Sequence, residues 1–402
     1  MKKRVFVSSF GIVCPLGDSP EKILGRMDSG GAVREASPAA NGGHSDIGVF
    51  SVKDFSVKAY TGRFKNARYL NRGAALSLAA AVLCIESARK QNPEDLSEAG
   101  LFVGAGPNLD LGLECPSITE GKMDTVLMKS LWILPFLPNT AASLISTHLG
   151  IHGENLTVGT ACAASLQAIG EAFRKVRDGY LPAALAGGGD SRLGPGGLSA
   201  YRMAGALHEN AAKPYAPFGK DREGFVPGEG GAFVWMEAMD AAERNKRKPV
   251  CEIVGFGASM DGHQMTAPHP EGFFGEKAVR AALDDAGIEA SGVGLVLAHG
   301  TGTPLNDDME AALIRRVFPH ARVTALKSHI GHGASASGAL ELCLALCCME
   351  KNTVPHIMNL SEPKEDRLHF VRKGGGPFPE YCVIQNFGFG GQNAAIVIRA
   401  LI

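Results

Sequence analysis

The sequence has no excess of either charge. Its 40 lysine and arginine residues face 41 aspartate and glutamate residues, and the formal net charge is -1 with histidine neutral. A chain without a net field has no general attraction to nucleic acid or to an anionic membrane surface. We therefore expect neither as a partner, and an acidic protein partner would have to meet a local basic patch.

Long apolar segments are also lacking. The run 74–87 contains Ser77 and Glu86 and is shorter than the roughly 20 apolar residues that a membrane span needs. Near the start, basic residues precede an apolar stretch as in a signal peptide, but two serines and a glycine interrupt it. We therefore predict no transmembrane segment, and a buried strand over Val5–Val13 in place of a leader.

Paired cysteine spacings are missing as well. The nine cysteines are an odd number, and no two of them form a Cys-x-x-Cys pair. This usage argues against a disulfide framework and against a zinc knuckle. The sequence therefore predicts a protein of a reducing compartment, the cytoplasm.

Glycine and proline, in contrast, are abundant and evenly spread. The 402 residues include 51 glycines and 22 prolines, which separate short apolar runs and suit many strand-to-helix turns. Run length and spacing predict strands at Val5–Val13, Leu101–Gly104, Ala183–Ala186, Gly231–Met236 and Leu295–Ala298, and helices at Arg72–Lys90 and Ala163–Asp178. This alternation predicts an α/β layered fold.

The chain also contains a faint internal duplication. The segment Leu78–Gly106 runs from a helix through an acidic turn into a strand, and Lys277–Gly302 repeats that plan. A chain of 402 residues is too long for one ordinary core. We therefore predict two halves, residues 1–250 and 251–402.

Cys162 is the candidate nucleophile. It lies where a β-prone run gives way to a helix, whose apolar face is Leu166, Ile169, Phe173 and Val176. Unpaired N–H groups and the positive dipole end at a helix start favour a thiolate, and the same N–H groups can bind an oxyanion. The alternative is a small buried hydrophobe, as free cysteines usually are. We interpret the other eight cysteines in that way, including Cys343, Cys347 and Cys348.

Two histidines are candidates for proton and charge chemistry. His299 follows a predicted strand, and His332 precedes a helix, where the dipole disfavours an imidazolium. Two neutral N–H donors on one carbonyl oxygen would stabilise an enolate, and Lys327 nearby would disfavour a further positive charge. A metal site of His299, Asp307 and His332 is the alternative. The lack of metal-type spacings argues against a metal.

These residues stand in motifs that resemble the elongating β-ketoacyl-[acyl-carrier-protein] synthases, which are Cys-His-His condensing enzymes of the thiolase superfamily. Four motifs match in order along nearly the whole chain, namely Thr160-Ala161-Cys162, His299-Gly300-Thr301-Gly302-Thr303-Pro304, Lys327-Ser328-x-x-Gly331-His332 and Asn386-Phe387-Gly388-Phe389-Gly390-Gly391. The resemblance implies a thiolase-like duplicated α/β/α/β/α layered fold. It also implies a decarboxylative Claisen condensation of an acyl thioester with malonyl-[acyl-carrier protein], in fatty-acid or polyketide-type chain elongation.

The resemblance also implies roles for individual residues. Cys162, in the N-terminal half, looks like the acylated nucleophile. His299 and His332, both in the C-terminal half, look like the pair that supports malonyl decarboxylation and carbanion attack. Lys327 looks like the residue that holds the second histidine, and Glu310 and Glu341 look like its ionic neighbours. Substrate-binding or gating roles fall to Phe389, Gly388, Thr301 and Thr303.

Substrates and partners follow from the same likeness. The family needs no cofactor or metal, because its substrates arrive on the phosphopantetheine arm of acyl carrier protein. The basic cluster Arg63, Lys65 and Arg68 stands where the family commonly docks that protein, and a solvated charged face is the alternative. The family forms homodimers in which the strand 156–159 pairs across the twofold axis. The sequence differs from the usual family pattern at Gly302, Gly333 and Gln392 and in residues 107–120. The resemblance therefore does not identify the acyl substrate.

Two other functions remain as alternatives. The chain could be a non-catalytic partner subunit, like the chain-length factors that shape the pocket of a ketosynthase, but such subunits typically lack the nucleophile. It could also be a thiolase or an initiating synthase. Thiolases use a second cysteine near the C-terminus, where 386–391 has none, and initiating synthases generally carry His and Asn where His299 and His332 stand.

Overall fold

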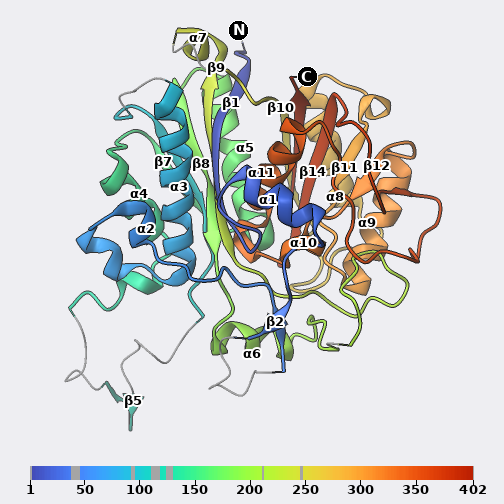
Figure 1. The fold of residues 1–402 in the computed structure, drawn as a ribbon, viewed down its shortest axis with the longest axis horizontal. Helices are drawn as coiled ribbons and strands as arrows, with labels where there is room; N and C mark the ends of the chain where they lie inside the picture. Colours follow the sequence, from blue (N-terminus) through green and yellow to red (C-terminus); the bar gives the residue numbers. More distant parts are fainter. Residues whose placement is uncertain are drawn as a thin grey trace.

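The structure is a computed structural model that describes residues 2–37, 46–91, 96–109, 118–123, 130–210, 212–244 and 248–401. Most of the segment 107–120, which differs from the usual family pattern, lies outside these residues. Eleven strands form one sheet in the order β13-β12-β11-β14-β15-β10-β1-β9-β8-β4-β7. The chain's N-terminal part supplies one side of this order and its C-terminal part the other (Figure 1).

The strands have the following bounds. On the N-terminal side they are β1 (Val5–Val13), β4 (Gly100–Gly104), β7 (Asn155–Val158), β8 (Ala183–Asp190) and β9 (Gly230–Ala238). On the C-terminal side they are β10 (Cys251–Met260), β11 (Leu295–Leu297), β12 (Arg322–Thr324), β13 (His369–Phe370), β14 (Tyr381–Gly388) and β15 (Gln392–Ala400). Two short hairpins pair β2 (Glu35–Ala36) with β3 (Gly48–Val49) and β5 (Ile118–Thr119) with β6 (Lys122–Met123).

The two sides of the sheet repeat one plan. Outward from β1, the strands β9 and β8 are antiparallel to their inner neighbours, and β4 and β7 are parallel to theirs. Outward from β10, the strands β15, β14, β11 and β12 follow the same rule. Strand β4 and strand β11, which end the two similar sequence segments, occupy equivalent places. The layered, duplicated α/β architecture expected from the sequence is therefore present.

The helices form three layers around the strands (Figure 1). The outer layers are α3 (Arg72–Gln91) with α4 (Thr140–Leu149), and α8 (Phe273–Ala286) with α9 (Pro304–Val317). The middle layer is α5 (Ala164–Arg177) with α11 (Ser337–Glu350). Five shorter helices are α1 (Pro20–Asp28), α2 (Lys58–Thr61), α6 (Pro195–Met203), α7 (Met239–Arg244) and α10 (Lys327–Ile330). No helix among the described ranges is long and apolar enough to cross a membrane.

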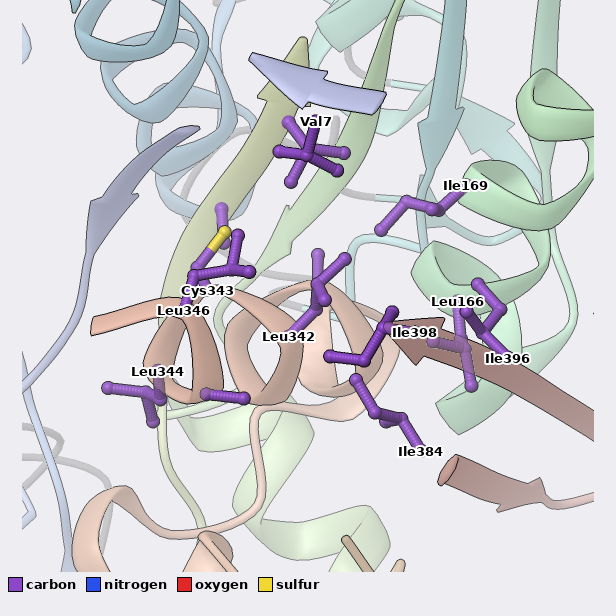
Figure 2. Packing of buried hydrophobic residues seen from close by; sticks show 14 of the residues in the cluster. Val7, Leu166, Ile169, Leu342, Cys343, Leu344, Leu346, Ile384, Ile396 and Ile398 are labelled. Atoms are coloured by element: carbon purple, nitrogen blue, oxygen red, sulfur yellow. The ribbon is translucent and has the colours of Figure 1, made fainter. Parts of the chain in front are cut away.

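The middle layer holds the two sides together. Strands β1 and β10 pair over only Val5–Val7 and Cys251–Ile253, so the two sides diverge, and α5 and α11 contact strands of both. Every residue of α11 from Ser337 to Met349 is buried, as expected for a helix that is apolar all round. Figure 2 shows Leu342 of α11 near Val7 of β1, Ile169 of α5 and Ile398 of β15.

The ends of several strands meet at one edge. Cys162 follows β7, Arg192 follows β8, His299 follows β11 and Phe389 follows β14, and all four residues line one cavity. In open α/β sheets this carboxyl edge is where ligands bind. The expected position of His299 at a strand's C-terminal end is therefore confirmed, and the edge supplies the candidate site.

A glycine contact tests the middle layer. A Cβ added at Gly170 of α5 would lie 2.2 Å from the ring of Phe256 in β10, so Gly170→Ala should lower the free energy of unfolding by about 1–3 kcal/mol through overpacking. The control is Gly25→Ala in α1, where a Cβ meets no atom within 4 Å and should stabilise by about 0.5–1 kcal/mol. Urea unfolding measures both, and equal effects would show that this contact does not limit stability.

Candidate active site

A strained turn presents Cys162. Residue Ala161 has a φ of +47°, which is uncommon for a residue with a side chain and marks a position that the surrounding structure enforces. A 3₁₀ turn over Ala161–Ala163 then leads into α5. The opposite wall approaches closely because Gly388 has no side chain. A Cβ there would lie 2.8 Å from the carbonyl oxygen of Thr160 and 3.0 Å from the backbone nitrogen of Cys162.

The environment of Cys162 differs in one respect from the sequence-based expectation. We expected the helix start to lower the pKa of Cys162, and this expectation is wrong, because burial raises it. The positive charges of Arg192 and Lys327 oppose that rise, as does the backbone N–H of Phe389, which donates to the sulfur. The thiol therefore becomes a nucleophile through a nearby base or through the loss of its proton during reaction.

The ring of His299 accepts hydrogen bonds at Nδ1. Lys327 Nζ lies 3.1 Å from this nitrogen and Asn386 Nδ2 lies 3.2 Å from it, and both partners are donors. Nδ1 therefore carries no proton, and Nε2 bears the hydrogen of the neutral ring. Burial, with Lys327 and His332 as further causes, lowers the pKa of His299 well below its ordinary value.

Lys327 does not hold the histidine that the family resemblance implied. Its Nζ donates to the carbonyl oxygen of His299 at 2.7 Å as well as approaching the His299 ring, so the prediction that it holds the second histidine, His332, is wrong. The expected neighbour Glu341 is confirmed, since Lys327 and Glu341 form a buried ion pair. Asn386 Nδ2 donates to the other Glu341 oxygen at 2.7 Å, which orients the amide toward His299.

Glu310 has a different task from the one expected. Its carboxylate accepts the backbone N–H groups of His299 at 2.6 Å and Gly300 at 2.8 Å, and the side chain of Gln385 at 2.7 Å. It thus fixes the glycine-rich turn after β11 and is not an ionic neighbour of Lys327. Burial raises the pKa of Glu310 to about 7.

The ring of His332 is fixed by other groups. Its Nδ1 accepts the backbone N–H of Ala334 at 3.2 Å and lies 3.0 Å from the hydroxyl oxygen of Ser337. Phe225 packs against the ring edge-on, with the centroids 5.0 Å apart. Nε2 therefore carries the hydrogen here too. Burial, then Lys327 and Arg192, lowers the pKa of His332 well below its ordinary value, so the predicted neutral state is supported.

The three chemical groups converge. The Sγ of Cys162 and one ring nitrogen of each histidine lie within 4.8 Å of one another, and the two imidazole rings are 5.5 Å apart and nearly perpendicular. They line a cavity of about 370 Å³. A metal would need an unprotonated nitrogen from each histidine, whereas the inward Nε2 atoms carry hydrogens. The alternative ligand Asp307 instead accepts backbone N–H groups of Phe218 and Gly302.

The remaining predicted residues fall into two groups. Thr301, Thr303, Gly388 and Phe389 line the cavity; the two threonine hydroxyls are 2.9 Å apart, and Phe389 is 41% exposed between glycines that permit backbone motion. The second group, Arg63, Lys65 and Arg68, is exposed on the N-terminal side and does not line the cavity.

Sequence reasoning missed several residues of the site. Asn386 was noticed as part of a motif but was given no role, and Ser337 carried no signal. Arg192 lines the cavity and pairs with Asp190, which also accepts from Ser335. These residues lie on or next to β8, β14 and α11, which are far apart in the sequence, so no spacing along the chain could have joined them.

Selective labelling tests the exposure of the nucleophile. Iodoacetamide should react with Cys162 before the other described cysteines, because Cys162 is half-buried and the seven others are buried. Burial raises the pKa of Cys14, Cys84 and Cys348 to about 12. Because the pKa of Cys162 is also raised, the rate at which it is labelled should still increase with pH above 9.0, the ordinary pKa of a cysteine thiol. Peptide mapping over a pH series, with Cys162→Ser as control, measures this, and earlier labelling of a buried cysteine in folded protein would contradict it.

Comparisons with known proteins agree with this geometry. The family models "Beta-ketoacyl synthase, N-terminal domain" and "Beta-ketoacyl synthase, C-terminal domain" match residues 2–242 and 250–361. The 3-oxoacyl-[acyl-carrier-protein] synthase 2 of Vibrio cholerae is 31% identical over all of both chains. A β-ketoacyl synthase structure from Burkholderia phymatum is 27% identical with a TM-score of 0.89, and the ishigamide ketosynthase/chain length factor is 25% identical with a TM-score of 0.88, each over 100% of both chains. The fold is therefore thiolase-like, and the chain belongs to the β-ketoacyl synthase family.

Proposed function

We propose that this chain joins an acyl group held on Cys162 to the two-carbon unit left when a malonyl thioester loses CO₂. The observation that carries the proposal is the meeting of one thiol and a ring nitrogen of each of two neutral histidines within 4.8 Å of one another in a single cavity. Transfer of an acyl chain needs the thiol, and carbanion formation needs the donors. The cavity supplies both in one place.

Acyl transfer uses Cys162 and the backbone around it. The Cys162 sulfur attacks the thioester carbonyl of the incoming acyl group, the new C–S bond forms, and the carrier thiol leaves with the proton that Cys162 loses. Negative charge develops on the carbonyl oxygen during the attack. The N–H of Phe389 already points at the sulfur, and with the N–H of Cys162 at the start of the turn before α5 it can hold that oxygen.

Decarboxylation uses His299 and His332. The C–C bond to the malonyl carboxylate breaks, CO₂ leaves, and the electron pair moves into an enolate whose oxygen accepts the two Nε2–H groups. The enolate carbon then attacks the thioester on Cys162, and the thiolate returns as leaving group. Each ring stays neutral because burial and the positive charge of Lys327 lower its pKa, so each remains a donor that gains strength as charge grows.

Carrier-bound substrates and a homodimer complete the proposal. The relatives named above are synthases of acyl-carrier-protein substrates, and we propose the same carriage for this chain, with docking at Arg63, Lys65 and Arg68. Strand β7 ends the sheet order, and Leu156 on it is 42% exposed. An unpaired edge of this kind suits pairing with a second copy. We further propose that residues 1–250 and 251–402 are the two halves, that no resident cofactor is needed, and that the protein works in the cytoplasm.

A non-catalytic partner subunit is the second candidate, since one structural relative is a ketosynthase/chain length factor pair. Such a subunit needs no nucleophile. Here Cys162 lies beside both histidines, and Lys327, Asn386 and Ser337 orient the rings. A site with this many supporting contacts favours catalysis.

The two half-reactions should fail separately in mutants. Cys162→Ala should abolish acylation and condensation yet still release CO₂ from a malonyl thioester, because both donors remain. His299→Ala and His332→Ala should each still become acylated at Cys162 but lose about 10²–10³ in decarboxylation rate, the usual cost of one oxyanion donor. Intact mass measures acyl-enzyme, and released CO₂ measures decarboxylation.

The matched control for these mutants is His320→Ala, which removes an exposed histidine outside the cavity. Near-ultraviolet circular dichroism confirms that each variant is folded. Condensation at the wild-type rate by folded His299→Ala and His332→Ala would refute the mechanism, and failure of wild-type Cys162 to accept any acyl group would favour the partner-subunit function.

Charge reversal tests the docking surface. Lys65→Glu with Arg68→Glu should raise the apparent KM for a carrier-bound substrate but leave a small thioester mimic nearly unaffected, because only the carrier presents an acidic surface. Lys277→Glu with Lys373→Glu makes the same charge change at exposed positions on the C-terminal side and should alter neither. Equal loss with both substrates would assign the cluster to folding, and no loss would place docking elsewhere.

A further inference from the structure

A charged side chain lies in the inner part of the cavity. Arg192 lines it together with Cys162 and His332, and only 13% of its side chain is exposed. Its neighbours in the wall include Ala161, Ala206 and Phe225, which are small or apolar. The outer rim, in contrast, carries exposed residues such as Leu305. A bound acyl group on Cys162 would therefore lie near a guanidinium group.

The hydrogen bond of Arg192 orients its guanidinium group and leaves N–H donors without a protein acceptor among the described residues. Nε donates to Asp190 Oδ2 at 3.1 Å. That oxygen is itself held by the backbone N–H of Ser335 at 3.2 Å and its hydroxyl at 2.8 Å. A guanidinium has five N–H donors, and within the described ranges the two terminal nitrogens of Arg192 meet no acceptor. Nη2 lies against Gly106, where an added Cβ would come within 2.0 Å of it, and Arg192 lines the cavity, so its remaining donors border the space that an acyl group would occupy.

A second polar group stands beside it. Tyr201 of α6 also lines the cavity, and its ring packs edge-on against Phe225, with the centroids 4.9 Å apart. Burial raises the pKa of Tyr201, so the phenol keeps its proton. No described residue accepts from its hydroxyl, which leaves a further donor on the same wall.

Donors placed in this way discriminate between acyl groups. An unsubstituted alkyl chain would displace water from Arg192 and Tyr201 and leave their N–H and O–H groups unpaired, which is costly in a buried site. An oxygen atom on the chain would accept from them. A site that hydrogen-bonds a substrate oxygen strongly rejects an analogue that lacks this oxygen. An apolar pocket rejects an analogue with an additional oxygen much less strongly.

We propose that Arg192 and Tyr201 form a polar acyl subsite that selects acyl thioesters carrying an oxygen acceptor near the thioester carbonyl. The inference rests on the proposed function and names its substrate class. Asp190 balances the charge of Arg192, so a neutral hydroxyl and a carboxylate are both acceptors that the subsite can take. Polyketide-type intermediates, which retain oxygen along the chain, belong to this class, and plain fatty acyl chains do not.

Competing acyl donors test the subsite. Wild-type protein is incubated with N-acetylcysteamine thioesters of 3-hydroxyhexanoate, succinate and hexanoate, and acylation of Cys162 is followed by intact mass. At least one oxygenated donor should react at least about tenfold faster than hexanoate, and the ratio between the two identifies hydroxyl or carboxylate as the preferred acceptor. Arg192→Met, which keeps length without donors, should slow the preferred oxygenated donor more than hexanoate, because loss of the positive charge near Cys162 affects both donors and loss of the hydrogen bonds affects only the first. Tyr201→Phe should shift the ratio the same way by less.

Controls make each outcome decisive. Arg280→Met removes an exposed arginine from α8 and should leave all three rates unchanged. Hexanoate reacting as fast as both oxygenated donors in wild-type protein would overturn the subsite, as would an equal loss with all donors in folded Arg192→Met and Tyr201→Phe. If Arg192→Met does not fold, the wild-type ratio and Tyr201→Phe decide. Acylation by none of the three would contradict the proposed function itself, and the subsite with it.

Discussion

Lys327 and Glu341 lie side by side between the two halves of the sheet, each with about 1% of its side chain exposed. Charges buried this deeply are tolerated only when they are paired and hydrogen-bonded, and removing one partner of such a pair costs about 3–5 kcal/mol. Asn386 donates a hydrogen bond to Glu341 of this pair, and both Lys327 and Asn386 donate to the ring of His299. The tautomer and the neutrality of that histidine therefore depend on the ion pair, and so does its capacity to donate into the cavity.

The duplicated architecture places these groups opposite the nucleophile. The turns before α5 and α11 have the same form, because Ala161 and Ala334 both have a φ of +47° and each begins a 3₁₀ turn that enters its helix. Cys162 stands after the first of these residues and Ser335 after the second. One half thus supplies the thiol at this position, and the other supplies a hydroxyl that holds Asp190. The two helices contact each other, so packing between the halves sets the distance from the thiol to the groups opposite it.

Charged groups in the cavity affect the histidines and the cysteine in different ways. Around the histidines, burial and the positive charge of Lys327 keep the rings neutral, since both lower the pKa values of His299 and His332. Beside Cys162, Arg192 opposes the rise in the pKa of the thiol that burial causes. Because Asp190 pairs with Arg192, the cavity gains hydrogen-bond donors without gaining a net charge. The same wall can therefore assist the nucleophile and read the acyl group.

The sequence by itself predicted several of the strands and helices, the candidate thiol and histidines, the place of His299 at a strand end, and the places of Cys162 and His332 before helices. Those features depend on local periodicity and on short motifs, which the chain order preserves. Contacts between distant segments were decided only by the tertiary structure. Lys327 orients His299 and not His332, and Glu310 holds a backbone turn, because packing of α9, α10 and α11 around β11 and β14 sets which side chains meet. Burial likewise has a larger effect than the helix start on the pKa of Cys162. Desolvation depends on all the segments that cover the thiol, and a local sequence pattern does not predict these segments.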